Sequence, residues 1–494
     1  MTKPIPFSVS DIGQALSVKA IAETPSENFV FSAICTDSRH IHKNDLFLAL
    51  KGENFDGESF IIDLFNKGIK GFVVHKDFFE RIPQDLKNKL TDQKNKISVF
   101  ETKSTLSALG SLARFQRLRS KAKIIAITGS SGKTTTRELT GQILKNTFKT
   151  LTTKGNFNNE IGLPLTLLRL SEEHEWAVVE MGMNHPGEIA RLSNIALPDI
   201  GIITNTSIAH LEGLGSADNI ALAKSEMFQN MNANSLAIIN IDDPRFNIME
   251  SKAKENSKIT EILRFGINKN ADIKASNISL SNGMTHFSIQ QKNGQDIDLS
   301  VNCPAPFMVL NAIAASIAAL KAGAGENDIS KTLKTFQPIK GRMNFIKFSD
   351  KLDLIDDTYN ANPDSVKQSI KTLALMAKKD NSIAVLGDML ELGKDSINLH
   401  KEIGMLAIEN QISKLYTHGE LSSHIVKEAV NHGFPENNTM NGTKKEIAEK
   451  IMKDVDSFNN SWVLVKGSRG MEMEKVIQAM ENIRNNNQEM EKSA

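Results

Sequence analysis

The residues best suited to chemistry form the glycine-rich segment Thr128-Gly-Ser-Ser-Gly-Lys-Thr-Thr135. It follows the apolar run Lys123–Thr128 and precedes a helix-like stretch that continues to Leu144. Such a turn lets backbone N–H groups approach phosphate oxygens, and the helix adds the positive end of its dipole. A lysine and a hydroxyl after the second glycine can reach phosphates and Mg²⁺. The nucleotide-binding loop predicted here comprises Gly129, Ser130, Ser131, Gly132, Lys133, Thr134 and Thr135.

Two polar residues that follow later apolar runs are candidates for binding a metal ion. Glu180 ends the run Trp176–Glu180, and His210 comes shortly after the run Ile200–Thr204. In an open parallel sheet the carboxyl ends of the strands face the ligand crevice, so we expect both side chains near the phosphate loop. A carboxylate at that edge suits Mg²⁺. Position alone leaves His210 open as a ligand or as a packing residue.

Two cations farther along the chain could act on phosphates. Lys224 lies in the helix-like segment Ala221–Phe228, where it could be a solvated lysine, a phosphate-contacting cation or a lysine that has reacted with CO₂. A carbamate would turn this cation into an anionic oxygen ligand for Mg²⁺. Arg342 stands at the junction of two blocks of sequence whose patterns differ. It could reach the γ-phosphate when domains close, or it could form a salt bridge within a linker.

These residues must be positioned by the elements around them, and the chain divides into three blocks. Short apolar runs between polar turns predict a small mixed α/β module, which the helical pattern of residues 102–119 follows. From residue 123, apolar runs alternate with helix-like segments, which indicates a buried, mostly parallel sheet, and the period-two pattern of 271–301 is typical of an antiparallel appendage. From residue 338 the pattern is again that of a doubly wound α/β fold.

The predicted fold class is therefore α/β with three domains, at residues 1–103, 104–337 and 338–494. We predict a small mixed α/β N-terminal domain, a central P-loop-type domain with a mostly parallel sheet and an antiparallel appendage, and a Rossmann-like C-terminal domain. The length of 494 residues agrees with this division, since domains average about 150 residues.

Composition excludes several classes of protein. Lys and Arg number 59 and Asp and Glu 58, so the net charge of +1 argues against a chain that binds nucleic acid or a membrane surface as a whole. The two cysteines, Cys35 and Cys303, exclude a disulfide framework and favour a reducing cytosol. The first residues lack the apolar stretch of a secretory signal, and no apolar run reaches the roughly 18 residues of a membrane span. We expect a multidomain cytoplasmic enzyme.

Taken together, the motifs resemble those of the Mur ligase family over residues 36–477. The segments that carry the resemblance are Thr36–Arg39, Ala49–Gly52, Thr128–Thr134, Gly155–Pro164, Glu180–Asn184, Ala209–Gly213, Ala223–Glu226, Gly341–Arg342, Asp356–Pro363, Leu386–Gly393 and Val465–Arg469. Those at 180–184, 356–363 and 386–393 separate the family member that adds D-alanyl-D-alanine from its siblings. The family usually carries Gly-x-His-Asn where Ala305–Met308 stands, and Asp-Gly-His where Asp56-Gly-Glu58 stands.

The resemblance implies an ATP-dependent ligase of peptidoglycan synthesis. It would join D-alanyl-D-alanine to UDP-N-acetylmuramoyl (UDP-MurNAc) tripeptide through an acyl phosphate, releasing ADP and phosphate. In chain order, the domains would bind the UDP-sugar, ATP and D-alanyl-D-alanine. The implied cofactors are ATP and two Mg²⁺ ions, and we expect a monomer.

The resemblance also implies roles for single residues. Thr134 and Glu180 would hold one Mg²⁺, and Glu180, His210 and a carbamylated Lys224 a second. The remaining assignments are Lys133, His210, Lys224 and Arg342 as catalytic residues, Asn311, Asp357, Tyr359 and Asn360 around the adenosine, Arg342 on the phosphates, Asn156, Asn158 and Asn159 near the muramoyl substrate, and Thr36, Asp37, Ser38 and Arg39 near the UDP end.

Three other functions stay open at this point. A sibling ligase or a folylpolyglutamate-synthase-like ligase would add a single amino acid. A P-loop NTPase acting as a switch or binding module would turn over nucleotide without a UDP-muramoyl peptide. The sequence does not say whether the third residue of the acceptor peptide is diaminopimelate or lysine.

Overall fold

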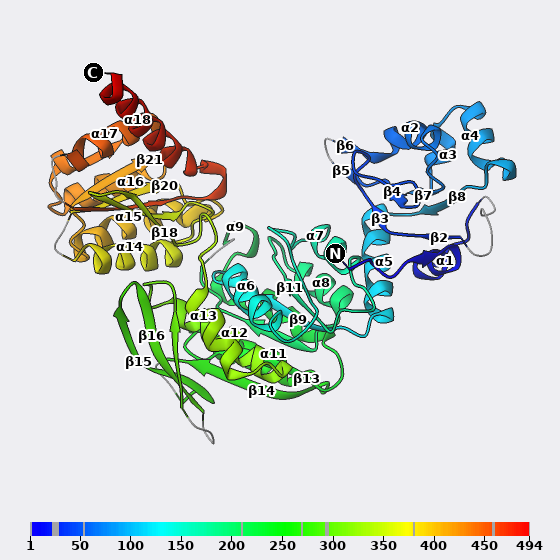
Figure 1. The fold of residues 1–494 in the computed structure, drawn as a ribbon, viewed down its shortest axis with the longest axis horizontal. Coiled ribbons are helices and arrows are strands. Elements are labelled where there is room, and N and C mark those ends of the chain that lie inside the picture. Colours follow the sequence, from blue (N-terminus) through cyan, green and yellow to red (C-terminus); the bar gives the residue numbers. More distant parts are fainter. Residues whose placement is uncertain are drawn as a thin grey trace.

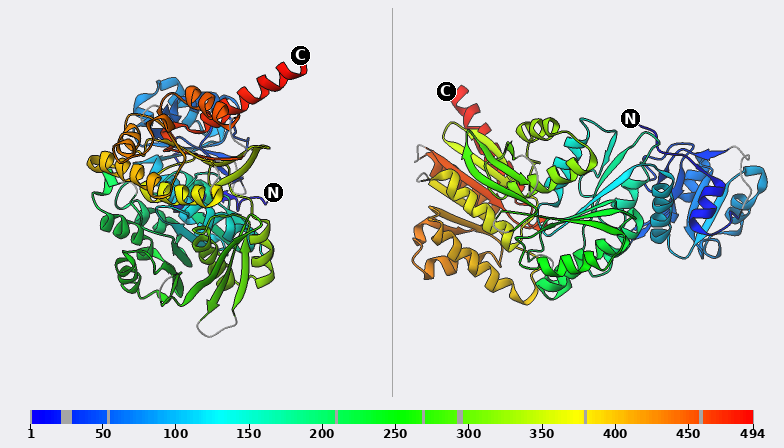
Figure 2. Two further views of the ribbon diagram at one scale, coloured as in Figure 1. Left: turned by 90° about the vertical axis from the view of Figure 1, so that its left-hand side faces the viewer. Right: turned by 90° about the horizontal axis from the view of Figure 1, so that it is seen from below.

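Three α/β domains follow one another along the chain in the computed structural model (Figure 1). The structure describes residues 2–21, 29–52, 55–208, 211–267, 270–291, 296–378, 381–456 and 460–493. The N-terminal and C-terminal domains lie at opposite ends of the central one, which gives an elongated molecule (Figure 2). The predicted three-domain α/β fold is thus confirmed, while the boundaries at residues 103 and 337 stay predictions.

The N-terminal domain is built on a four-stranded parallel sheet. Its strands, in spatial order, are β3 (Ile34–Cys35), β4 (Leu46–Leu48), β7 (Gly71–His75) and β8 (Ser98–Thr102). Alternate residues of β4 enter different cores: Phe47 packs with α2 (Ile61–Asn66) and α4 (Gln84–Thr91), whereas Leu46 and Leu48 pack with α5 (Thr105–Arg119). The smaller elements are β1 (Phe7–Ser8), α1 (Val9–Leu16), β2 (Val30–Phe31), β5 (Lys51–Gly52), β6 (Phe55–Asp56) and α3 (Phe78–Arg81).

Helix α5 connects this domain to the next. The helix predicted from residue 102 begins at Thr105, because the Ser104 hydroxyl accepts the N–H of Ser107 at 3.2 Å and caps the first turn. Leu109 and Leu112 are fully buried, as their spacing predicts, but Leu106 is 38% exposed. The core around α5 continues into the central sheet, so the first two domains share apolar packing.

The central domain contains one nine-stranded sheet. Its strands, in spatial order, are β10 (Thr150–Thr152), β11 (Trp176–Glu180), β9 (Lys123–Thr128), β12 (Ile200–Ile203), β13 (Ser235–Asn240), β14 (Ile259–Gly266), β15 (Ile273–Ser281), β16 (Met284–Gln291) and β17 (Ile297–Val301). Neighbours from β10 to β15 are parallel, and β16 and β17 are antiparallel. The predicted appendage is therefore antiparallel but continues the main sheet, because Phe265 of β14 pairs with Ile273 of β15.

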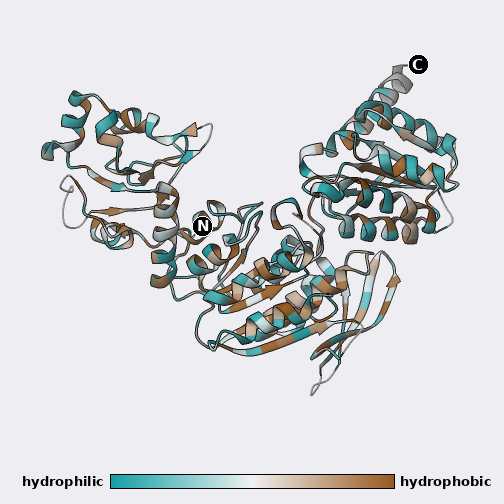
Figure 3. Ribbon diagram, turned by 180° about the vertical axis from the view of Figure 1, so that it is seen from behind, coloured by the Kyte–Doolittle hydropathy of each residue, from teal (hydrophilic) through white to brown (hydrophobic). Residues whose placement is uncertain are grey.

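Helices cover both faces of the central sheet, whose strands are largely apolar (Figure 3). One face packs against α6 (Lys133–Leu144), α12 (Met308–Ala322) and α13 (Glu326–Thr335). The other packs against α7 (Gly162–Leu167), α8 (Glu188–Ala196), α10 (Ala217–Ser225) and α11 (Phe246–Lys254). Burial on both faces explains why these strands read as continuous apolar runs.

The C-terminal domain has a six-stranded sheet. Its strands, in spatial order, are β18 (Asn344–Ser349), β19 (Leu352–Asp357), β23 (Ser461–Lys466), β20 (Asn381–Gly387), β21 (Lys414–His418) and β22 (Thr439–Asn441), and only β18 is antiparallel to its neighbour. One face carries α14 (Pro363–Ala377), α15 (Ser396–Glu409) and α16 (Ser423–Asn431), and the other α17 (Lys444–Asp456) and α18 (Glu474–Ser493). Across the described residues, no helix combines the length and apolar character needed to span a membrane.

Candidate active site

The glycine-rich loop leads from β9 into α6, and a side chain at either of its two glycines would be strained. Gly129 has a φ of +152° and Gly132 one of +82°, conformations that side chains disfavour. A Cβ on Gly129 would lie 1.9 Å from Thr204 Oγ1, and one on Gly132 would lie 2.2 Å from Asn311 Oδ1. The loop is therefore closely packed between the end of β12 and helix α12. Its backbone is held by Thr204, whose hydroxyl donates to the Ser131 carbonyl at 2.6 Å.

Lys133, the first residue of α6, curls back over this loop. Its Nζ donates to the carbonyl of Gly129 at 2.7 Å. Burial lowers the pKa of Lys133; the nearby Glu180 carboxylate acts in the opposite direction, and the Arg342 charge adds to the lowering. The ammonium therefore occupies the place where a phosphate oxygen could replace a backbone carbonyl as its acceptor.

Glu180 lies at the carboxyl end of β11 and is 1% exposed. The Thr134 hydroxyl donates to its Oε2 at 2.9 Å, and Asn158 Nδ2 donates to its Oε1 at 2.7 Å. The described residues contain no group of three or more His, Cys, Asp or Glu side chains able to hold a metal ion. A hydroxyl and a carboxylate nevertheless fit Mg²⁺, which takes few protein ligands and completes its shell with phosphate and water oxygens.

Lys224 lies on α10 and faces the same space. It is only 2% exposed, so, of the three possibilities left open by the sequence, burial excludes a solvated lysine. Burial, and secondarily the charge of Lys133, hold the pKa of Lys224 well below its ordinary value. Among the residues that the structure describes, none forms a hydrogen bond or ion pair with its ammonium. A buried cation without a partner is costly, which favours its neutral amine.

The predicted adenosine side of the site begins at the link between the second and third domains. The guanidinium of Arg342 stacks on the Tyr359 ring, 4.0 Å from its centroid. Gly341 and Met343, on either side of the arginine, have φ values of +76° and +50°. Asp356 accepts the N–H of Gly341 at 3.0 Å, which fixes this turn. The linker thus directs Arg342 toward the C-terminal domain without requiring a salt bridge.

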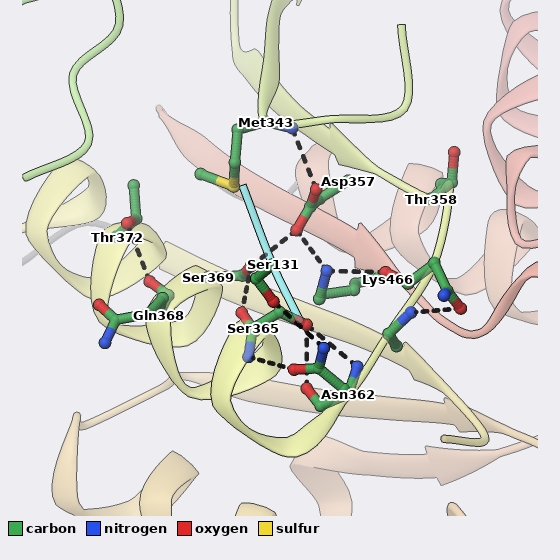
Figure 4. A network of polar contacts seen from close by, with 12 residues as sticks. Ser131, Met343, Asp357, Thr358, Asn362, Ser365, Gln368, Ser369, Thr372 and Lys466 are labelled. Carbon is green, nitrogen blue, oxygen red and sulfur yellow. Dashed lines mark hydrogen bonds and ion pairs between the residues drawn. The ribbon is translucent and has the colours of Figure 1, made fainter. Parts of the chain in front are cut away.

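Asp357, at the end of β19, is tied to the neighbouring strand (Figure 4). Its Oδ2 accepts from Lys466 Nζ at 2.5 Å and from the Ser369 hydroxyl at 2.8 Å. Lys466 ends β23, is 2% exposed and also donates to the Asn360 carbonyl at 2.9 Å. The carboxylate predicted to bind adenosine therefore also compensates a buried lysine.

Between residues that the structure describes, hydrogen bonds join the central and C-terminal domains beside the glycine-rich loop. Asn362 Nδ2 donates to the Ser131 hydroxyl at 3.1 Å, and the N–H of Glu212 donates to the Glu391 carbonyl at 3.1 Å. Asn362 also caps α14 by accepting the N–H of Ser365 at 2.9 Å. Figure 4 shows Ser131 of the glycine-rich loop beside Asn362 and Ser365 at the start of α14.

A cavity of about 970 Å³ lies where these elements meet. The predicted residues that line it are Ser130, Ser131, Gly132, Lys133, Thr135, Asn156, Asn158, Asn159, Glu180, Lys224, Asn311, Arg342, Asp357, Tyr359 and Asn360. Gly129 and Thr134 are not part of its lining, and Thr134 is buried behind it against Glu180. Residues from two domains thus form one site.

The asparagines predicted near the muramoyl substrate have different positions. Asn158 uses its side chain on Glu180, and Asn159 Oδ1 accepts the N–H groups of Ile161 at 3.2 Å and Gly162 at 2.9 Å, at the start of α7. Asn156 is exposed at the cavity. The side chains of Asn158 and Asn159 are therefore partly occupied in holding the loop that carries all three asparagines.

The residues predicted at the UDP end lie elsewhere. Thr36, Asp37, Ser38 and Arg39 follow β3 and do not line the cavity. The Arg39 guanidinium donates to Asp37 at 2.8 and 2.9 Å, and these hydrogen bonds hold the pKa of the Asp37 carboxyl well below its usual range. His210 lies outside the described residues.

The departure at Glu58 has a local explanation. Its Oε1 accepts the N–H of His75 at 2.8 Å, and its Oε2 pairs with Arg81 at 2.5 Å. The side chain is 8% exposed and therefore joins β7 to α3 within the domain. The other departure is at Ala305–Met308, and the Asn311 side chain that follows it lies against Gly132.

Several lining residues were missed by the sequence analysis. They are Leu106, Asn205, Asp242, Asp243, Arg245, Met343 and Lys466. A signal existed for two groups, because Asp242 and Asp243 follow β13 and Lys466 ends β23, at the same strand ends that pointed to Glu180. Nothing in the local pattern distinguishes Leu106 from the buried leucines of α5.

Three stretches of the chain match domains of one known protein family. Residues 30–117 match the Mur ligase family, catalytic domain; residues 127–319 match the Mur ligase middle domain; and residues 341–469 match the Mur ligase, glutamate ligase domain. The chain therefore belongs to the Mur ligase family, whose members are ligases.

Within that family, the relatives that match nearly the whole chain are named as UDP-N-acetylmuramoyl-tripeptide–D-alanyl-D-alanine ligase or, among solved structures, as MurF. The chain is 35% identical to the UDP-N-acetylmuramoyl-tripeptide–D-alanyl-D-alanine ligase of Buchnera aphidicola, over 94% of this chain and 97% of that protein. MurF from Acinetobacter baumannii has a TM-score of 0.83 and 32% identity, covering 97% and 100% of the two chains. MurF ligase from Thermotoga maritima, solved with ADP, has a TM-score of 0.76 and 25% identity, covering 94% and 98%.

Proposed function

We propose that this chain is the ligase that joins D-alanyl-D-alanine to UDP-MurNAc-tripeptide, with ATP converted to ADP and phosphate. The observation that carries the proposal is the cavity of about 970 Å³ in which the phosphate loop, Glu180 and buried Lys224 meet residues of the C-terminal domain. The name shared by relatives that match nearly the whole chain supports the choice of substrates. We place the reaction in the cytoplasm and expect a monomer.

The chemistry requires activation of a carboxylate, because hydroxide is too poor a leaving group for an amine to displace. An oxygen of the acceptor carboxylate attacks the γ-phosphorus of ATP, the bond to ADP breaks, and an acyl phosphate forms. The amine of D-alanyl-D-alanine then attacks the acyl carbon. The tetrahedral intermediate collapses with loss of phosphate and a proton, leaving the amide.

Lys133 and Arg342 have the positions needed to bring the two anions together. Lys133 would donate to phosphate oxygens in place of the Gly129 carbonyl. Arg342 would leave the Tyr359 ring, or tilt on it, to reach the phosphates from the linker. Both cations offset the repulsion between carboxylate and triphosphate and stabilise the charge that develops in transfer. Asn311, Asp357, Tyr359 and Asn360 form the proposed adenosine side.

Thr134 and Glu180 would hold Mg²⁺, whose charge stabilises the transferring phosphoryl group when it is bound. Glu180 would share a second ion with His210 and Lys224. For Lys224 we propose a carbamate, formed as its neutral amine adds to the carbon of CO₂ and releases a proton. The burial and unpartnered ammonium of Lys224 support this, because the carbamate replaces a disfavoured cation by an anion that a metal can neutralise.

The three domains would divide the substrates. We assign the UDP-sugar to residues 1–103, ATP to 104–337 and D-alanyl-D-alanine to 338–494. Because an acyl phosphate hydrolyses readily, water must be excluded while the amine arrives. The hydrogen bonds from Asn362 to Ser131 and from Glu212 to Glu391 support a closure of the C-terminal domain onto the central one at this point.

The deciding experiment measures ADP and phosphate release with UDP-MurNAc-tripeptide, with and without D-alanyl-D-alanine. We expect turnover only with both substrates, and an ¹⁸O label in the acceptor carboxylate should appear in the released phosphate. Turnover with a single amino acid, or with a folate and glutamate, would identify the other ligases. Nucleotide hydrolysis that ignores the UDP-muramoyl peptide would favour a switch or binding module instead.

A further inference from the structure

Arg137 is a buried cation that none of the steps above uses. It lies on α6, one turn beyond Thr134, and is 2% exposed. An arginine is rarely buried so completely unless its charge and its donors are satisfied. Its surroundings therefore indicate what it does.

The guanidinium faces the loop that follows β10. Nη1 donates to the carbonyl of Thr153 and pairs with Glu138 at 2.7 Å, and Nη2 donates to the carbonyl of Gly155 at 3.5 Å. These carbonyls lie at the start of the loop that carries Asn156, Asn158 and Asn159. The flat fork of one arginine can serve two such carbonyls, which the single ammonium of a lysine cannot do in the same way.

The same guanidinium also faces the carboxylate at the centre of the site. Arg137 Nε lies 3.6 Å from Glu180 Oε2 and, within the described part of the chain, has no hydrogen-bond partner. The positive charge of Arg137 therefore acts on Glu180, while Oε2 still accepts its hydrogen bond from the Thr134 hydroxyl. Glu180 keeps its hydrogen bonds while a positive charge compensates its burial.

The loop is fastened to Glu180 by further contacts. Asn158 Nδ2 donates to Glu180 Oε1 at 2.7 Å, and the N–H of Glu180 donates to the Thr153 hydroxyl at 3.2 Å. The N–H of Gly182 donates to the Asn158 carbonyl at 2.8 Å, and a Cβ on Gly182 would lie 3.0 Å from the Asn158 side chain. The loop and the end of β11 are thus one packed unit, with Arg137 behind both.

We propose that Arg137 is a positioning residue that keeps the acceptor loop, residues 153–159, in fixed relation to Glu180. The acceptor carboxylate and the phosphoryl group must approach within bonding distance, so small errors between their binding elements reduce the rate strongly. Arg137 removes that freedom by holding the loop backbone and the Glu180 charge with one rigid group. The assignment of this loop to the acceptor rests on the function proposed above.

The test compares Arg137→Met, Arg137→Lys and the control Glu138→Gln, which removes the charge of a guanidinium partner outside the loop. Arg137→Met should raise the KM for UDP-MurNAc-tripeptide about tenfold or more and lower kcat, with the KM for D-alanyl-D-alanine changed less than about twofold. Arg137→Lys should recover part of the loss, and Glu138→Gln should resemble the wild type.

A second measurement reports on the loop without any substrate. Lys154 is exposed within it, so trypsin cleavage after Lys154, followed by mass spectrometry, should be faster in both Arg137 variants than in Glu138→Gln. If Arg137→Met does not fold, Arg137→Lys decides both measurements.

Two outcomes would overturn the proposal: unchanged cleavage and acceptor KM in Arg137→Lys, or KM values for all three substrates that rise in step. A wild-type enzyme that ignores UDP-MurNAc-tripeptide would instead refute the proposed function. In that case the cleavage rates would still report whether Arg137 holds the loop.

Discussion

Two lysines at the same cavity have opposite environments. Lys224, in the central domain, and Lys466, in the C-terminal domain, are each 2% exposed and both line the site. Lys466 donates to the Asp357 carboxylate at 2.5 Å and to the Asn360 carbonyl at 2.9 Å. No described residue provides such a partner for Lys224, whose pKa is held far below its ordinary value by burial and by Lys133.

The difference separates a structural cation from a reactive amine. Breaking a buried ion pair is costly because the remaining charge is left without compensation. A buried lysine without a partner is instead itself the uncompensated group, so removing its charge does not harm the fold. A chain keeps such a residue when its neutral amine has a use, and perturbed groups in cavities are candidates for function on these grounds.

The largest expected effect is on the paired lysine. Lys466→Met leaves the Asp357 carboxylate buried without its cation, and we expect a loss of about 3–5 kcal/mol in the free energy of unfolding. Urea denaturation at neutral pH measures it. The double variant Lys466→Met/Asp357→Asn should lose less than the single one. Equal losses, or a single variant as stable as the wild type, would show that the pair does not hold β19 to β23.

The unpaired lysine should behave in the opposite way. Lys224→Ala is expected to reduce ligation by roughly 10²–10³-fold, the usual loss when one preorganised group is removed from a site, with a smaller loss of stability than Lys466→Met. Added short carboxylates such as acetate or formate should restore part of the rate if a carbamate provides an oxygen ligand. An active Lys224→Ala enzyme, or an inactive one that gains nothing from carboxylates, would argue against the carbamate.

The pH dependence of stability sharpens the comparison. Below the folded-state pKa of Lys224, folded and unfolded chains are both protonated, and the fold bears the full cost of a buried ammonium. Between that pKa and the ordinary value, only the unfolded chain binds the proton, so stability rises with pH by at most about 1.4 kcal/mol per pH unit.

Lys224→Met removes this dependence. In buffers without CO₂, the variant should be more stable than the wild type at neutral pH, and the difference should shrink as the pH rises toward 10. Denaturation midpoints across this range measure it. A constant difference would mean that Lys224 stays protonated in the folded chain.

The sequence predicts only part of the contrast between Lys224 and Lys466. The strands at Lys123–Thr128 and Trp176–Glu180 were predicted with correct bounds because parallel strands buried on both faces form continuous apolar runs. The rule that strand ends face the site also found Glu180. It overlooked Lys466, because pairing with Asp357 depends on the neighbouring positions of β19 and β23, whose order in the sheet is not local information.

Burial was equally hidden. Lys224 and a solvated helical lysine look alike in a sequence, since only tertiary packing decides which face of α10 is covered. The three asparagines of the acceptor loop were also treated alike, although Asn158 contacts Glu180 and Asn159 holds the start of α7. Side chains that serve the loop itself can be told from those that face the cavity only when partners distant in sequence are known.

The smallest expected effect tests whether the paired lysine also supports closure of the domains. Lys466 holds the Asn360 carbonyl, and two residues later Asn362 caps α14 and donates to Ser131. Asn362→Ala removes the cap and the domain contact, and should cost about 1 kcal/mol of stability. Ser131→Ala removes only the contact, and one such partly buried hydrogen bond is worth about 0.5 kcal/mol. If urea denaturation finds equal losses for the two variants, the contact and not the cap provides the energy, and the rigid C-terminal network then extends into the phosphate loop.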